Sequence, residues 1–250
     1  MTGSTSSYSQ FSEDRQLAEI FGAATGCCLE VGAFDGVTGS TTLAFEQRGW
    51  QAILVEPLPE MAALARSRRR GPVFAVAAGP HDGYVVIRRS REDIALSGVA
   101  GIGTQEELQR LRRITFEAIE VRQLTLDQIL SESRVARLDF ATIDVEGFES
   151  SVLMGFDLER WRPRVVILED NSRGLDPTVP TLMARRGYRR FRTTGVNDWY
   201  ARRGDRPLVS RRALARDAIR IFLRRCRPLP KRILPSPIKR LLRRLGAGYR

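Results

Sequence analysis

Short apolar segments that alternate with helix-like segments constrain the fold of this chain more than any other feature. The segments that we predict to be buried strands are residues 27–31, 52–55, 73–78, 140–143 and 165–168. The segments that we predict to be helices are residues 13–21, 41–48, 59–70, 150–154 and 180–186. Strands that are apolar along their whole length and separated by helices indicate a parallel sheet with helices on both faces.

The last two predicted strands follow a different pattern. Residues 188–193 and 199–202 are separated by a short Gly-Val-Asn-Asp turn, so we expect them to pair in the antiparallel sense. In the less regular middle of the chain, residues 84–88 and 114–121 are typical of strands. A capping box, Thr-Leu-Asp-Gln, begins a helix at Thr125.

The first motif with chemical content is residues 29–36, Leu-Glu-Val-Gly-Ala-Phe-Asp-Gly, which lies between the first strand and the next helix. Gly32 allows a tight turn with space for a ligand beside it, and Gly36 allows a close approach before the helix. About 20 residues further on, Glu56 ends the second strand, where nucleotide-binding α/β folds place a carboxylate on the ribose hydroxyls.

The acids in this motif indicate which nucleotide would bind. A dinucleotide fingerprint needs glycine where this chain has Phe34, and a pyrophosphate needs a helix N-terminus without acids. S-adenosylmethionine suits the turn better, because it carries a ribose, an ammonium and a sulfonium but no phosphate. The alternative is a structural glycine turn with an incidental glutamate, which the combination of motif, strand and Glu56 disfavours. The predicted cofactor-binding residues are Glu30, Gly32, Asp35, Gly36 and Glu56.

A second acidic motif, Ile-Asp-Val-Glu-Gly-Phe-Glu at residues 143–149, follows a central strand. Ligands in open α/β sheets bind at this carboxyl edge. Asp144 and Glu146 are the predicted catalytic residues, since either could orient an acceptor hydroxyl or accept its proton during an in-line methyl transfer. Acids matched to a helix N-terminus are the alternative, and this explains Glu149 well but Asp144 poorly.

A metal site is a weaker hypothesis. Asp144, Asp170 and Asn171 would lie at neighbouring strand ends with oxygen ligands that suit Mg²⁺. Because Asp and Asn are also common turn residues, we predict no metal. The one histidine, His81, lies in a Pro-His-Asp-Gly turn, which argues against a histidine-dependent hydrolase.

The net charge of +12 is unevenly placed. Residues 202–250 hold 17 of the 41 Lys and Arg but two of the 29 acids, so a slightly acidic domain precedes a strongly basic tail. This distribution excludes a uniformly basic nucleic-acid binder. Arginines recur every four residues at positions 212, 216, 220 and 224, with a separate apolar face of Leu214, Ala218, Ile219 and Phe222.

Two interpretations of this tail stay open. Basic amphipathic helices over residues 205–250 suit an anionic membrane surface. The tail could equally be solvated, disordered or docked on the acidic domain. Nucleic acid is disfavoured because interleaved aromatic residues are missing apart from Phe222 and Tyr249.

Taken together, several motifs resemble the FkbM family of S-adenosylmethionine-dependent methyltransferases over about residues 8–203. The segments that carry the resemblance are residues 9–14, 30–36, 49–50, 53–57, 143–149 and 196–200. The family usually has Lys before Ile-Asp in the later motif, whereas this chain has Thr142.

This resemblance implies a class I methyltransferase fold, a Rossmann-like sheet of seven mostly parallel strands whose last strand is antiparallel. It also implies that Glu30, Gly32, Gly36 and Glu56 line the cofactor site, and that the acceptor is a hydroxyl of a sugar or a natural product. For Gln10, Glu13 and Asp14, folding back over the cofactor and forming a solvated helix start are equally supported.

We therefore predict an α/β methyltransferase domain at residues 13–204, after a flexible N-terminus (1–12) and before a basic helical tail (205–250). The predicted activity is S-adenosylmethionine-dependent O-methylation of a sugar or glycoconjugate. A natural-product or lipid acceptor, or a non-catalytic membrane-surface adaptor, is the alternative. The N-terminus lacks the features of a secretory signal, and Cys27 and Cys28 suit the start of a buried strand better than a disulfide or metal site. These features predict a cytoplasmic protein, which the tail could bring to the inner membrane face.

Overall fold

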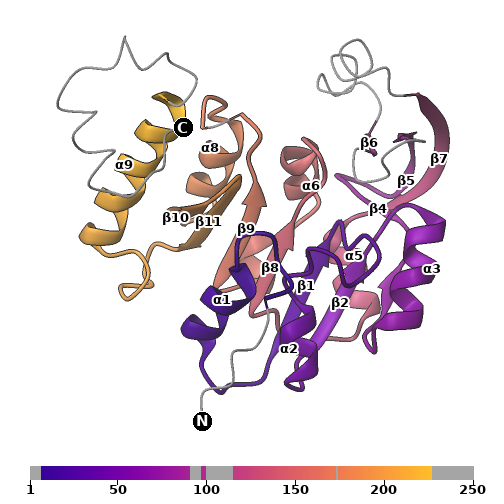
Figure 1. Ribbon diagram of the computed structural model, residues 1–250, viewed down its shortest axis with the longest axis horizontal. Coiled ribbons are helices and arrows are strands. Elements are labelled where there is room, and N and C mark those ends of the chain that lie inside the picture. Colours follow the sequence, from indigo (N-terminus) through magenta and orange to yellow (C-terminus); the bar gives the residue numbers. More distant parts are fainter. Residues whose placement is uncertain (1–6, 91–96, 100–114, 173, 227–250) are drawn as a thin grey trace.

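The computed structural model describes residues 7–90, 97–99, 115–172 and 174–226. A central seven-stranded sheet with the order β10-β11-β9-β8-β1-β2-β3 runs through the molecule (Figure 1). Its strands are β1 (Cys27–Val31), β2 (Gln51–Val55), β3 (Val73–Phe74), β8 (Phe140–Ile143), β9 (Val165–Glu169), β10 (Tyr188–Thr194) and β11 (Asn197–Arg202).

Strand direction in this sheet matches the expectation. From β3 to β9 all neighbours are parallel, whereas β11 is antiparallel to both β9 and β10. The described helices are α1 (Glu13–Phe21), α2 (Leu43–Gln47), α3 (Pro59–Arg68), α5 (Leu126–Glu132), α6 (Glu149–Met154), α7 (Leu158–Trp161), α8 (Thr178–Arg185) and α9 (Arg211–Cys226). The predicted fold class, a mostly parallel α/β sheet of the class I methyltransferase type, is confirmed.

Alternation along β1 divides the core into two layers. Leu29 points into a cluster that α5, α6 and α8 cover, whereas Cys28 points into a cluster that includes Leu17 of α1 and Phe45 of α2. Both faces of β1 are fully buried. Successive side chains of a strand point to opposite faces, so a strand in this position must be apolar throughout.

The sequence expectation for residues 73–78 was wrong in one respect. We predicted one strand there, but β3 ends at Phe74 and β4 (Ala77–Ala78) belongs to a second sheet. A bend at Val76 separates the two strands and lets β4 pair with β7. The second sheet has the order β4-β7-β5-β6, with β5 (Gly83–Ser90), β6 (Gly98–Val99) and β7 (Phe116–Leu124).

Two helix starts show how local side chains set the boundaries. The capping box is present, because the amide of Gln128 donates to Thr125 Oγ1 at 3.1 Å and the Thr125 amide donates to Gln128 Oε1 at 2.9 Å. Helix α7 was not predicted. The carboxylate of Asp157 caps it by accepting the amides of Glu159 and Arg160, as N-cap aspartates do.

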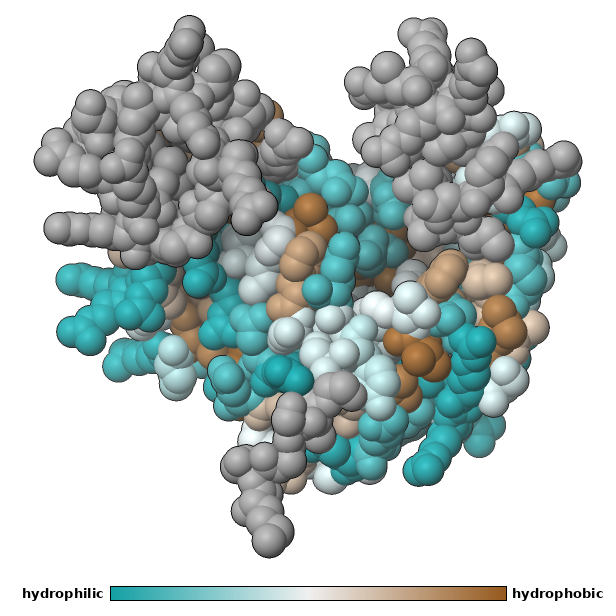
Figure 2. All heavy atoms as spheres, viewed as in Figure 1, coloured by the Kyte–Doolittle hydropathy of each residue, from teal (hydrophilic) through white to brown (hydrophobic). Residues whose placement is uncertain are grey.

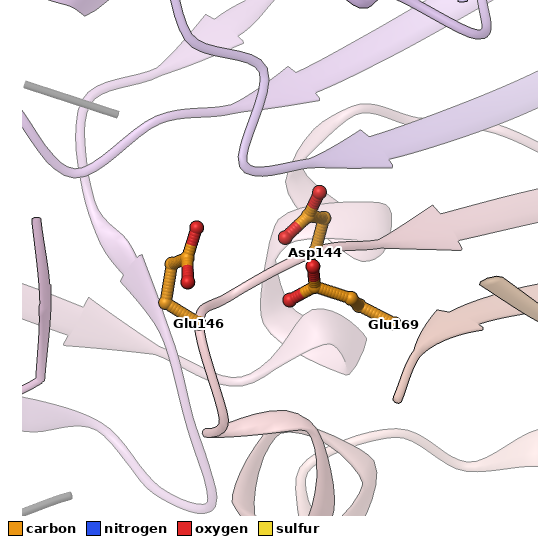
Figure 3. A group of neighbouring side chains, drawn as sticks. All are labelled: Asp144, Glu146 and Glu169. Atoms are coloured by element: carbon orange, nitrogen blue, oxygen red, sulfur yellow. The ribbon is translucent and has the colours of Figure 1, made fainter. Parts of the chain in front are cut away.

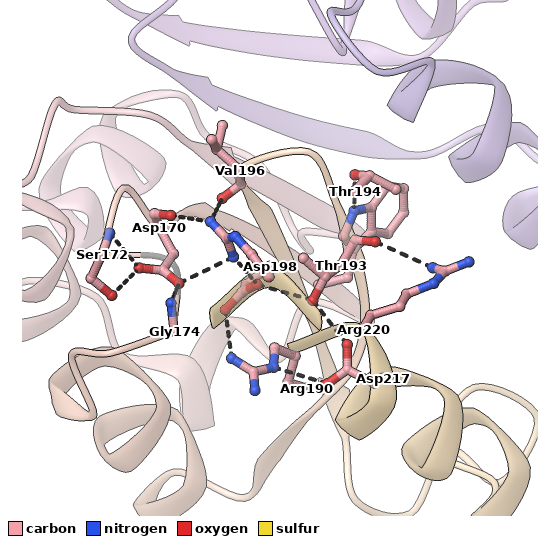
Figure 4. A network of polar contacts seen from close by, with 12 residues as sticks. Asp170, Ser172, Gly174, Arg190, Thr193, Thr194, Val196, Asp198, Asp217 and Arg220 are labelled. Atoms are coloured by element: carbon pink, nitrogen blue, oxygen red, sulfur yellow. Dashed lines mark hydrogen bonds and ion pairs between the residues drawn. The ribbon is translucent and has the colours of Figure 1, made fainter. Parts of the chain in front are cut away.

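Helix α9 is docked on the edge of the sheet by ion pairs (Figure 4). Asp198 of β11 is buried and accepts from Arg190 at 2.7 Å and from Arg224 at 3.3 Å. Asp217 of α9 accepts from Arg190 at 2.9 Å, and Ile221 is buried. For α9, therefore, the docked interpretation of the tail applies. Residues 227–250, where the second basic segment was predicted, lie outside the described residues.

The outer surface of α9 is strongly polar at one end. Hydrophilic side chains gather over the N-terminal half of the helix, on the left of the view in Figure 2. Among the described helices, none combines the length and the apolar character that a membrane span requires.

Candidate active site

A cavity of about 590 Å³ lies at the carboxyl ends of β1, β2, β8 and β9. Residues of the N-terminal segment and of β4, β5 and β6 also line it. Its carboxylic acids are Glu13, Glu30, Glu56, Asp144, Glu146 and Glu169. Among the described lining residues there is no Lys or Arg, so the cavity presents a surplus of carboxyl groups to a ligand.

Gly32 brings the end of β1 against the end of β8. Its φ of +82° lies in the left-handed region, and a Cβ there would come within 1.9 Å of the Asp144 carbonyl oxygen. Glycine is required for both reasons. The turn predicted after the first strand is present, and Gly32 lines the cavity.

Glu56 lies at the end of β2 with its carboxylate at the cavity wall. Its two oxygens accept the backbone amides of Phe34 at 2.8 Å and Leu58 at 2.9 Å. Burial nevertheless raises the pKa of Glu56 to about 7. Each oxygen keeps a second lone pair, so the carboxylate can still accept from a ligand hydroxyl.

Glu30 lines the cavity, but its carboxylate is already bound by the protein. It accepts the Ser40 hydroxyl at 2.7 Å, the Thr41 amide at 2.6 Å and the Thr42 hydroxyl at 2.5 Å. The buried guanidinium of Arg69 lies 3.5 Å away. This geometry makes Glu30 the centre of the loop that follows β1.

Asp35 and Gly36, which the sequence also assigned to the cofactor, do not line the cavity. The carboxylate of Asp35 accepts the amides of Val37 and Thr38 at 2.9 and 2.7 Å and pairs with Arg68. These contacts hold the turn, and we assign both residues to the loop rather than to the ligand.

The start of the described chain folds over the cavity. Tyr8, Gln10 and Glu13 are among its lining residues, and Glu13 accepts from Asn197 at 2.8 Å. Asp14 is buried and points away from the cavity. Its carboxylate accepts hydrogen bonds from the hydroxyls of Ser7 and Ser9 and from the amide of Tyr8. Residues 7–12, predicted to be flexible, thus make specific contacts.

Three carboxylates gather at the ends of β8 and β9 (Figure 3). Asp144, Glu146 and Glu169 each offer an oxygen, and these atoms lie within 4.8 Å of one another. Sequence analysis found the first two and missed Glu169, which Asn171 orients by donating to it at 2.8 Å. Such spacing could hold a hard cation.

The set of metal ligands considered from sequence does not come together. Asp170 turns away from Asp144 and accepts from Arg224, Ser172 and Gly174. Asn171 donates to Glu169 and so serves the acidic cluster indirectly.

The acidic cluster holds a proton. Burial, with the charges of Glu30 and Glu13, raises the pKa of Asp144, although its carboxylate is open to the cavity. Burial and the charge of Asp144 raise the pKa of Glu169 to about 10, and the two carboxyls are hydrogen-bonded to each other. Because two adjacent carboxylates cannot both ionise easily, the pair shares one proton near neutral pH.

Glu146 and Glu149 have different surroundings in the loop after β8. Glu149 is buried, accepts the amides of Val145 and Gly147 at 3.2 Å each, and has a pKa that burial raises to about 7. Glu146 lines the cavity from a backbone with φ of +54°. This conformation is uncommon for a residue with a side chain and is often found at functional sites.

The strand order, with the cavity at the carboxyl ends of the strands, is that of the class I methyltransferase fold. The profile of the FkbM methyltransferase domain matches residues 30–190, and the chain belongs to this family. Methyltransferases of the FkbM family use S-adenosylmethionine, the cofactor predicted from the sequence.

The other comparisons add little. No curated protein is significantly similar to the chain. One similar solved structure is the O-methyltransferase from Bacillus cereus in complex with SAH, which is 16% identical with a TM-score of 0.39. The match covers 78% of this chain and 81% of that one.

The raised pKa of Glu169 predicts a pH-dependent stability. The pKa is higher in the folded than in the unfolded protein, so this carboxyl stabilises the fold below pH 4.5 and loses that contribution as pH rises towards 10. We expect E169Q and wild type to have the same melting temperature at pH 5. At pH 9 the variant should melt about 2–4 °C higher for each kcal/mol of unfolding free energy that ionised Glu169 costs the wild type.

Thermal unfolding followed by circular dichroism measures this difference. The matched control is E120Q, which removes an exposed carboxylate from β7. A melting difference that does not grow with pH, or that E120Q reproduces, would contradict the shared proton.

Proposed function

We propose that the cavity binds S-adenosylmethionine and that the protein transfers the methyl group to a hydroxyl oxygen of a sugar or glycoconjugate. The observation that carries the proposal is the composition of the lining, with six carboxylic acids and no basic residue among those described. A ligand with an ammonium and a sulfonium suits this wall, whereas a phosphate would be repelled.

The shape of the cavity also fits the cofactor. Its volume lies in the range of small-molecule sites. Phe34, Leu58, Ala77 and Ile87 form an apolar end that suits an adenine ring. Glu56 lies close to this end, since its carboxylate accepts the amides of Phe34 and Leu58, and it suits the ribose hydroxyls.

The protein's own groups account for the proton that an O-methylation releases. When bound, S-adenosylmethionine supplies an electrophilic methyl group. Glu146 and the Asp144–Glu169 pair face the same space, where they can orient an acceptor hydroxyl and receive its proton. The pair shares one proton and can take up a second, which suits it to a buffer role beside Glu146.

The same wall supports the proposal of a polyhydroxylated acceptor. Carboxylates bind neighbouring hydroxyls with pairs of charge-assisted hydrogen bonds, and three of them converge here. A natural-product or lipid hydroxyl remains the alternative acceptor, and a non-catalytic adaptor remains the alternative function.

The first test concerns the cofactor. We expect E56Q to weaken S-adenosylmethionine binding by about 10–100-fold, because a hydrogen bond to a charged group contributes about 1.5–3 kcal/mol. For wild type the affinity should rise between pH 6 and 8, since Glu56 ionises near pH 7, and E56Q should reduce this rise.

Calorimetric titration at several pH values provides both measurements. E132Q, which removes an exposed carboxylate at the end of α5, is the control. Unchanged affinity in E56Q argues against the ribose contact, and no binding by wild type would favour the adaptor.

The second test concerns the transfer. We expect D144N and E146Q each to lower kcat by about 10²–10⁴-fold, which is the usual contribution of a positioned proton acceptor. Cofactor affinity should change little. Activity is measured by incorporation of labelled methyl into panels of glycans, lipids and phenolic natural products, with E132Q as the control.

Two results would count against this assignment. Unchanged kcat in both variants would remove the catalytic role of the cluster. Methylation confined to the lipid or phenolic panel would replace the sugar acceptor with one of the alternatives.

We further propose that α9 contacts an anionic membrane surface. Ala215, Ile219 and Phe222 lie on one solvent-facing side of the helix, and the last two are 41% and 47% exposed. Arg211 and Arg212 flank this side and are exposed. An apolar stripe bordered by arginines is typical of helices that lie in the membrane interface.

Replacing the stripe without changing charge tests this contact. We expect I219Q/F222Q to bind anionic vesicles roughly 3–30-fold less tightly than wild type, from the partial burial of two apolar side chains. L64Q, at a similarly exposed position on α3, is the control in vesicle co-sedimentation. Equal binding by the double variant and the control would contradict the proposal.

A further inference from the structure

A second cavity of about 510 Å³ lies between α1, β10 and the N-terminal half of α9. It shares no described lining residue with the acidic cavity, since Glu13 at the start of α1 lines that cavity whereas Gln16 and Glu19 line this one. Its basic residues are Arg192, Arg212, Arg216 and Arg220. We call it the arginine groove.

The groove has more positive charge than its acids can neutralise. Its two carboxylates are Glu19, which is exposed, and Asp217, which is committed to Arg190 and Thr193. Arg212 and Arg216 are exposed, and their guanidinium groups form no hydrogen bond or ion pair within the described residues. The groove therefore carries uncompensated guanidinium groups.

Neutral partners hold the other two arginines, Arg192 and Arg220, at the wall of the groove. Arg192 donates to Gln16 Oε1 at 3.0 Å and stacks over Trp199. Arg220 donates to the carbonyl oxygen of Thr193 at 3.2 Å (Figure 4). Both partners are neutral, so neither contact cancels a positive charge. Burial lowers the pKa of Arg192, the charge of Glu19 opposes this shift, and the nearby Arg220 adds to it.

Docking of α9 does not require Arg212 or Arg216. The helix is anchored by Asp217 near its middle and by Arg224 near its end, where Arg224 pairs with Asp170 and Asp198. Arg212 and Arg216, which lie four residues apart, repel each other on the free half of the helix. A row of unpaired like charges costs stability unless an anion binds to it.

We propose that the arginine groove binds a phosphate group, carried either by a lipid head group or by a soluble phosphate ester. Guanidinium groups present a fork of donors that matches phosphate oxygens. Phe191, Pro207 and Leu208 add an apolar wall beside the arginines, which a phosphate with an organic substituent would contact. This site is independent of the methyl-transfer proposal, and it borders the apolar stripe of α9 at Arg212.

Inorganic pyrophosphate is the first probe, titrated calorimetrically into the full chain at low salt. We expect saturable binding that R212Q/R216Q weakens at least about tenfold, since both forks are lost. The control is R70Q/R185Q, which removes the same charge from exposed positions on other parts of the chain. R212K/R216K keeps the charge but loses the forked guanidinium donors, so its affinity for pyrophosphate should lie between those of R212Q/R216Q and the control.

Vesicles of phosphatidylcholine with and without phosphatidylglycerol are the second probe, and they distinguish the sources. A lipid head group is indicated by three results together. R212Q/R216Q loses binding to anionic vesicles, the control variant keeps it, and pyrophosphate competes with it in wild type. Selective loss of pyrophosphate binding, with equal vesicle binding by both double variants, indicates a soluble phosphate ester.

One pattern of results overturns the proposal. If R212Q/R216Q and R70Q/R185Q behave alike with both probes, the arginines act only through net charge and the groove is not a site. Circular dichroism of each variant confirms that the comparison is between folded proteins.

Discussion

The close contact between Gly32 and the end of β8 is the constraint on which the rest of the site depends. The amide of Asp144 donates to the Val31 carbonyl, and the Gly32 amide donates to the Val55 carbonyl, so β1, β2 and β8 end together. A side chain at position 32 would collide with the Asp144 carbonyl. This packing turns both acidic loops towards one space, and the cavity is the result.

Placing many carboxyl groups around one space requires that their charge be compensated. The charge of Glu30 is compensated by two hydroxyls, a backbone amide and Arg69. Backbone amides compensate Glu56 and Glu149, and a shared proton compensates the Asp144–Glu169 pair. Thr142, which stands where the FkbM family usually has lysine, is buried and lines the cavity. The cluster is left with a capacity for positive charge, which a cationic cofactor can fill.

The sequence predicts much of the fold because buried parallel strands leave a strong signal. The bounds of β1 and β8 were predicted without error, since every residue in them is apolar or faces a buried layer. The break between β3 and β4 could not be predicted, because both halves are equally apolar and the second sheet that captures β4 forms through distant pairing with β7.

Prediction of the site was less complete for a similar reason. The sequence identified Glu30 and Asp35 as candidate site residues. It could not show that their carboxylates are hydrogen-bonded within the loop, because the amides and hydroxyls that donate to them lie several residues away. Glu169 could have been found, because alternation in β9 places it on the same side as Ile167, which also lines the cavity. Asp170, which was considered from the sequence only for the disfavoured metal site, lies on the other side.

The position of Asp170 also changes how the basic tail relates to the domain. Asp170 and Asp198 are each adjacent in sequence to a residue that lines the acidic cavity, namely Glu169 and Asn197. Arg224 of α9 pairs with both aspartates from behind the cavity wall. A division at residue 204 therefore separates the wall from a cation that supports it. Through residue 226, the basic segment packs against the edge of the sheet, and its exposed Arg212 and Arg216 lie in the N-terminal half of α9, away from Arg224.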